Sequence, residues 1–133
     1  MANEFIDLNP ARNYTFSSVV KAGNFIYTAH IGGFIDKNGN AIDDIEDQTK
    51  QCFETLKARL AVADASLNDV IKINVYLKNA DLKKRQENFK KMREIYRGNF
   101  EKGKYPVRTA LFTEFLDDKC LIQIDAIAYR GTT

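Results

Sequence analysis

The sequence predicts a two-layer α+β domain, in which two helices cover one face of a mixed, largely antiparallel sheet. Two stretches with apolar residues at three- and four-residue steps predict the helices, and six stretches rich in apolar and β-branched residues predict the strands. The predicted order is strand-strand-strand-helix-strand-helix-strand-strand. A length of 133 residues suits one domain with a sizeable core, so we expect a single domain over residues 1–133.

Two of the first three predicted strands form a hairpin. Residues 5–8 are a short apolar stretch, while residues 17–22 and 24–29 flank Gly23-Asn24, which indicates a tight turn. Gly32-Gly33 then marks a place where the backbone needs either positive φ or a close approach to another segment. This part of the chain therefore predicts three strands that precede the first helix.

The middle of the chain predicts helix, strand and helix. Residues 45–63 have a helical period of apolar residues, and Asp44 lies where a carboxylate suits the positive end of the helix dipole. Residues 79–81 are a cap signal for a second helix over residues 82–97. Between the helices, residues 68–78 have apolar side chains on both faces, which predicts a central strand.

The last two predicted strands carry the first candidate functional residue. Residues 105–112 and 120–129 are separated by a short acidic turn, so we expect them to pair as a hairpin or near-hairpin. Arg108 shares a face with Ala110 at the start of the first of these strands. An arginine in an apolar strand is costly unless an anion or a ring of acceptors meets it. The two open interpretations are ligand binding and a structural ion pair, either with Asp125 or with a partner subunit.

The predicted sheet has a second face that no predicted helix covers. Residues 70–77 and 122–128 are too apolar to face water, so we expect self-association through this face. The basic residues of the second helix are interleaved with glutamates and lack aromatic neighbours, which is typical of a solvated surface rather than of a nucleic-acid site.

Composition argues against several function classes. The formal charge of +2 is too small to indicate a nucleic-acid or membrane binder. No apolar run approaches the ~20 residues of a membrane span, and residues 1–4 lack a signal-peptide pattern. Cys52 and Cys120 lie in apolar patterns without zinc or redox spacing. We therefore expect buried thiols, no metal and a cytoplasmic location.

Several stretches, in their order and spacing, resemble one known family over nearly the whole chain. They are residues 16–28, residues 45–57, residues 67–78, and Pro106-Val107-Arg108 followed by Ile122-Gln123-Ile124. The family is the Rid (YjgF) family of reactive-intermediate imine deaminases, also called the endoribonuclease L-PSP family. The resemblance implies a chorismate-mutase-like fold, a homotrimer with clefts between subunits, and no cofactor or metal.

The resemblance also implies a reaction and a set of site residues. Arg108 would bind the carboxylate of a small 2-imino or enamine acid, because a guanidinium fork suits a carboxylate. Hydrolysis of the C=N bond would give a 2-keto acid and ammonia. The expected catalytic residues are Arg108 and Gln123, and the expected substrate-binding residues are Arg108, Phe16, Tyr14, His30 and Ala110.

Three positions depart from the family pattern. Gln123 stands where deaminating members carry a glutamate, and an amide cannot exchange a proton as a carboxylate does. Phe16 stands where the family has a tyrosine, although Tyr14 lies on the same face and offers a hydroxyl. His30 stands where the family has glycine, so it either narrows the cleft or adds an acid/base group. A non-catalytic binder of small carboxylates, such as keto acids, is therefore the alternative function, and RNA binding or cleavage is a third, less favoured one.

Overall fold

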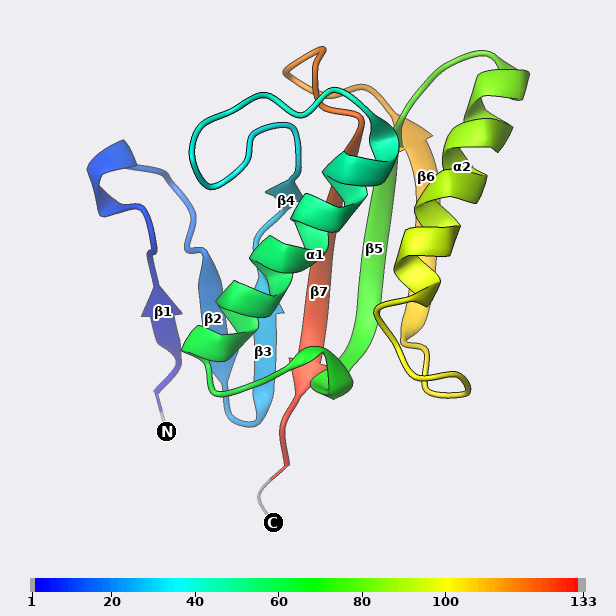
Figure 1. Ribbon diagram of the computed structural model, residues 1–133. Helices are drawn as coiled ribbons and strands as arrows, with labels where there is room; N and C mark the ends of the chain where they lie inside the picture. Colours follow the sequence, from blue (N-terminus) through cyan, green and yellow to red (C-terminus); the bar gives the residue numbers. More distant parts are fainter. Residues whose placement is uncertain (1, 132–133) are drawn as a thin grey trace.

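The computed structural model describes residues 2–131, which form a seven-stranded sheet with two helices on one face (Figure 1). The strands are β1 (Glu4–Ile6), β2 (Val19–Ala22), β3 (Phe25–Thr28), β4 (Ile31–Gly32), β5 (Val70–Lys78), β6 (Val107–Thr113) and β7 (Ile122–Tyr129). The helices are α1 (Ile45–Val62) and α2 (Leu82–Arg97), and two 3-10 helices cover Pro10–Arg12 and Leu67–Asp69. The predicted α+β class is confirmed, and the strand absent from the prediction is the two-residue β4.

The strand order is β1-β2-β3-β7-β5-β6, with β4 paired to β7. The predicted pairing of the last two strands is wrong, because β5 lies between them. β5 runs parallel to β6, with Ile73 opposite Arg108, and antiparallel to β7, with Val75 opposite Ile124. The parallel pairing is possible because α2 carries the chain back to the start of β5, which a short turn cannot do.

Side-chain caps begin both long helices, as the sequence predicts. The Asp44 carboxylate accepts the backbone N–H of Asp47 at 2.8 Å, and this bond lowers the pKa of Asp44. The Asp81 carboxylate accepts the backbone N–H of Lys84 at 2.9 Å. Each cap satisfies a backbone donor that the first helical turn leaves unpaired.

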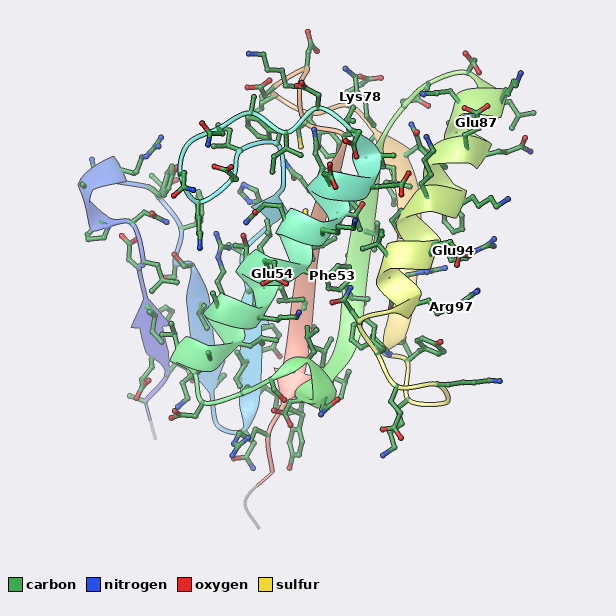
Figure 2. The ribbon with its side chains drawn as sticks, viewed as in Figure 1. Phe53, Glu54, Lys78, Glu87, Glu94 and Arg97 are labelled. Atoms are coloured by element: carbon green, nitrogen blue, oxygen red, sulfur yellow. The ribbon has the colours of Figure 1, made fainter. Side chains whose placement is uncertain are left out.

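The core lies between the helices and the sheet. Phe53 of α1 is buried and packs edge-on against Tyr96 of α2 at 5.8 Å and against Phe100 at 5.9 Å, measured between ring centroids. Figure 2 shows Phe53 on the inner side of α1 and Glu54 on its outer side. The facing strand residues that complete this core include Ile73, Val75, Leu77, Ile122 and Ile124.

A buried amide ties α1 to two loops. Gln48 is fully buried, and its side chain donates to the carbonyl oxygens of Ile42 at 2.8 Å and Lys119 at 2.9 Å. It also accepts the backbone N–H of Leu121 at 2.9 Å. A Cβ added at Gly33 would overlap the Gln48 carbonyl oxygen, so the close approach that the sequence predicts occurs at this glycine.

Within residues 2–131, no helix lies on the opposite face of the sheet, which we call the uncovered face (Figure 1). Side chains alternate along each strand, so the residues next to the buried ones point to this face. Its exposed large apolar side chains are Phe5, Phe25, Tyr27, Val107, Leu111 and Tyr129. The predicted uncovered apolar face is confirmed, and self-association through it stays a prediction.

Candidate functional site

Arg108 lies on the helix-covered face of β6, against two aromatic rings of α2. Its Cζ atom is 4.9 Å from the ring centroid of Tyr96 and 5.4 Å from that of Phe89. Among residues 2–131, Arg108 forms no ion pair. Asp125 instead accepts a hydrogen bond from the Asn74 amide at 2.9 Å, so the ion pair with Asp125 that we considered is absent.

The aromatic contacts orient the guanidinium without neutralising its charge. Tyr96 and Phe89 lie within cation–π distance of Arg108 and restrict its position. The N–H edges of the group accordingly stay available for a planar anion such as a carboxylate. Arg108 is exposed, but the two rings hold it in place and no side chain of the described residues neutralises its charge, which suits an anion-binding residue.

A cavity of about 340 Å³ opens beside this arginine, between α2 and the start of β6. We call it the Arg108 pocket. Its lining residues are Arg93, Tyr96, Arg97, Tyr105, Pro106 and Arg108. Ala110 follows on the same face of β6, half-buried and opposite Val75.

Tyr96 lines the pocket and has a buried hydroxyl group. Tyr96 is only 4% exposed, and its hydroxyl has no hydrogen-bond partner among residues 2–131. Burial raises the pKa of Tyr96 to about 12, although the nearby charge of Arg108 acts in the opposite direction. The hydroxyl therefore remains protonated at neutral pH and can donate to an anion.

The other predicted site residues gather elsewhere, around β4 and the start of β7. The rings of Tyr14 and Phe16 stack at 4.8 Å, and the Phe16 and His30 rings lie 5.3 Å apart. His30 directly precedes β4, whose Gly32 pairs with Gln123. We call Tyr14, Phe16, His30 and Gln123 the glutamine half-site. The expected placement of Tyr14 on the same side as Phe16 is confirmed.

The structure does not bring Arg108 and Gln123 together in one chain. Across β5, Arg108 is opposite Ile73 and Gln123 is opposite Tyr76. Ile73 and Tyr76 are three residues apart on one strand, so their side chains point to opposite faces of the sheet. The Arg108 pocket is on the helix-covered face, whereas Gln123 faces the uncovered side. One small substrate can contact both groups only if two chains contribute to its site.

Sequence reasoning missed the α2 residues of the Arg108 pocket. The helical period places Phe89 and Tyr96 on one side of the helix, but nothing local indicates that Arg108 lies beside them. That contact depends on the pairing of β6 with β5, which is a long-range feature. The one sequence feature that could have indicated an anion site on this helix is the pair Arg93 and Arg97, which lie four residues apart on one helix face.

The described residues contain neither a candidate metal site nor a candidate membrane span. Over positions 2–131, no three His, Cys, Asp or Glu side chains are grouped so that they could hold a metal ion. In the same part of the chain, neither helix is long and apolar enough to cross a membrane.

Comparison with known proteins gives a family match over most of the chain. The family model described as endoribonuclease L-PSP matches residues 7–130. A RutC family protein of Pyrococcus horikoshii is 42% identical over 116 residues, which is 86% of each chain. The putative reactive intermediate deaminase TdcF of Escherichia coli is 26% identical over 114 residues, or 84% of each chain.

Solved structures show the same architecture. RidA from the Antarctic bacterium Psychrobacter sp. PAMC 21119 is similar with a TM-score of 0.76 and 31% identity, over 88% of this chain and 89% of that one. E. coli TdcF with bound serine has a TM-score of 0.77 and 24% identity, over 89% and 90% of the two chains. These similarities confirm the expected fold.

Proposed function

The chain belongs to the endoribonuclease L-PSP (Rid) family, and we propose on this basis that it is an imine deaminase that converts small 2-imino or enamine acids to 2-keto acids and ammonia. Its relatives include a protein named a putative reactive intermediate deaminase. The observation that carries the proposal is Arg108, whose guanidinium is held by two rings at a pocket and has no carboxylate partner among residues 2–131.

We propose that the active site forms between subunits of a homotrimer. The Arg108 pocket of one subunit would face the glutamine half-site of the next, and three such contacts would close a ring. Two observations support this arrangement. The two sets of residues lie on opposite faces of the sheet, and the uncovered face carries apolar side chains that a partner subunit would bury.

In the proposed mechanism, Arg108 binds the substrate carboxylate and so directs the imine carbon toward Gln123 of the next subunit. The Gln123 carbonyl accepts a hydrogen bond from water, whose oxygen forms a bond to the imine carbon as the C=N electron pair moves to nitrogen. The nitrogen takes up the two protons that the attacking water gives up, one at addition and one as the C=O bond forms, and the C–N bond then breaks to release ammonia and the keto acid.

The test uses imines generated in situ by an amino-acid oxidase. We expect the protein to accelerate loss of imine, followed as the amount trapped by semicarbazide. Arg108→Ala should lower kcat/KM by about 100-fold, because it removes a charged group that orients the substrate. Arg130→Ala is the matched control. Arg130 is exposed, and its ion pair with Asp69, at 3.7 Å, is a surface pair that contributes little to stability. Loss of imine no faster than in buffer, for several amino acids, would contradict the proposal.

A non-catalytic carboxylate binder is the second candidate, and Gln123 is the observation that favours it. An amide orients water but transfers no proton, so the site could bind a keto acid without turnover. Calorimetric binding of 2-ketobutyrate, lost in Arg108→Ala, together with no imine hydrolysis would favour this candidate over the deaminase. RNA binding has less support, because glutamates are interleaved with the basic side chains of α2 and no exposed aromatic side chain lies among them to stack on bases.

A further inference from the structure

The Arg108 pocket holds more positive charge than one carboxylate neutralises. Three of its six lining residues are arginines, and none carries a carboxylate. Among residues 2–131, Arg93 and Arg108 form no ion pair. Arg97 contacts Glu94 at 3.5 Å, with side chains 57% and 54% exposed. Solvent screens such an exposed pair strongly, so Glu94 does little to reduce the positive potential in the pocket.

The three guanidinium groups come from two elements, so the pocket has two separate positions at which an anionic group could bind. Arg108 belongs to β6, whereas Arg93 and Arg97 lie four residues apart on α2 and so project from the same side of the helix. Two cationic positions therefore border one cavity of about 340 Å³, a size at the lower end for small-molecule sites. A ligand that reaches both positions needs an anionic group at each end.

We propose that the substrate of this site is a 2-imino dicarboxylate, with its 2-carboxylate on Arg108 and its side-chain carboxylate on Arg93 and Arg97. The inference rests on the proposed function for the imine chemistry. It adds the substrate class, namely the imines of amino acids with acidic side chains. The corresponding 2-keto dicarboxylate is the product and the stable ligand of the same pocket.

The Tyr96 hydroxyl is an independent observation that points to an acceptor group beside the arginines of this pocket. Tyr96 lines the pocket, is 96% buried, and leaves its hydroxyl without a partner among residues 2–131. A buried hydroxyl of this kind is destabilising unless a ligand or water satisfies it. A carboxylate oxygen bound by the neighbouring arginines would accept its proton in a hydrogen bond.

The first experiment compares acidic with neutral substrates. Imines are generated in situ from L-glutamate or L-aspartate and from L-alanine or L-leucine, and kcat/KM is measured for each. We expect the wild-type protein to prefer the acidic imines by at least about 10-fold, from one added charged hydrogen-bonding contact. Arg93→Gln and Arg97→Gln should each remove most of this preference, because each lowers kcat/KM for the acidic imines more than for the neutral ones. Lys90→Gln is the matched control, because Lys90 is an exposed cation of α2 outside the Arg108 pocket.

The second experiment measures binding without turnover. Calorimetry should show that 2-ketoglutarate binds at least about 10-fold more tightly than 2-ketobutyrate, and that Arg93→Gln removes the difference. Added NaCl should weaken 2-ketoglutarate binding more than 2-ketobutyrate binding, because two charges are screened rather than one. Circular dichroism of each variant checks that the fold is retained.

The outcomes separate this inference from the proposed function. Hydrolysis of neutral and acidic imines at equal rates, with equal binding of the two keto acids, would overturn the dicarboxylate assignment and leave the deaminase in place. Absence of turnover on every imine would contradict the deaminase. In that case, tighter binding of 2-ketoglutarate that Arg93→Gln abolishes would still support the pocket assignment, and equal binding would overturn it.

Discussion

At the scale of single residues, Tyr96 combines two roles with opposite effects on stability. Its ring packs against Phe53 at 5.8 Å and Phe100 at 5.0 Å in the core. Its hydroxyl, however, is buried beside Arg108 without a hydrogen-bond partner among residues 2–131. A purely structural position would be filled better by phenylalanine, so the hydroxyl is retained at a cost that ligand binding would explain.

Tyr96→Phe should therefore stabilise the ligand-free protein by about 1 kcal/mol, measured by urea unfolding at pH 7. Burial raises the pKa of Tyr96 from 10.0 to about 12. The folded state then holds the Tyr96 proton more tightly than the unfolded state does. The resulting contribution to the free energy of unfolding is fully present below pH 10 and is lost as pH rises toward 12. The free energy of unfolding of Tyr96→Phe should therefore fall less between pH 10 and pH 12 than that of the wild-type protein. A steeper alkaline loss in the variant would contradict the burial of an unpaired hydroxyl.

Gln123 is the residue at which a single substitution would test the catalytic half of the proposal. Gln123→Glu supplies a carboxylate that can exchange a proton with water, so kcat for imine hydrolysis should rise by about 100-fold, the lower end for general acid–base catalysis. The measurement is the imine-trapping assay. Gln51→Glu on α1, outside both parts of the site, is the control and should leave kcat unchanged. An unchanged kcat in Gln123→Glu would show that Gln123 does not face the substrate.

At the scale of elements, the contact between α1 and the segment after β4 positions the glutamine half-site. Gly33 follows β4 and lies against the Gln48 carbonyl of α1, where a Cβ would overlap backbone atoms. Arg59 of α1 also donates to the His30 carbonyl at 3.3 Å. Helix α1 therefore sets where β4 lies, and with it the position of His30 beside Phe16.

Gly33→Ala should destabilise the protein by about 3 kcal/mol, the upper end for overpacking, because the helix backbone cannot move away from the added methyl group. Chemical unfolding measures the change. Gly98→Ala is the control, since Gly98 has right-handed φ and an added Cβ would meet its nearest atom at an ordinary 3.6 Å. That control should be neutral or slightly stabilising. Equal stability of the two variants would contradict the close contact at Gly33.

Local signals predict the elements well, and the pairing of distant elements poorly. The caps at Asp44 and Asp81 and the hairpin at Gly23 could be read from the sequence because neighbours a few residues away create them. The pairing of the last two strands was wrong because the α2 crossover decides it. For the same reason no role could be predicted for Arg85, whose guanidinium lies 5.7 Å from the Phe112 ring centroid. Arg108 was identifiable as a site residue, but its aromatic supports were not.

At the scale of the whole molecule, each chain carries two incomplete parts of the proposed site. Arg108 and Gln123 lie on opposite faces of the sheet, so neither part can act alone on a small substrate. A ring of subunits would join unlike surfaces, and every cleft would take Arg108 from one chain and Gln123 from another. Activity would then depend on assembly, and dilution to monomers would abolish it.

Mixing two inactive variants tests this arrangement. Arg108→Ala and Gln123→Ala should each lower activity at least about 10-fold when alone. Co-refolded in equal amounts, they should recover about a quarter of wild-type activity, because that share of clefts in a randomly mixed ring receives both intact residues. Each variant refolded alone is the control, and sedimentation velocity confirms that assembly is unchanged. No recovery in the mixture would place both residues in the same chain's site.

The central place of β7 also has a consequence for synthesis on the ribosome. β7 is the last of the strands to be made, yet it joins β3 on one side to β5 on the other. Until it emerges, β1–β3 and β5–β6 are two separate strand groups with exposed edges, and such edges are prone to aggregate. The nascent chain therefore passes through a stage in which both groups await the same strand, and during that stage we expect it to depend most on chaperones.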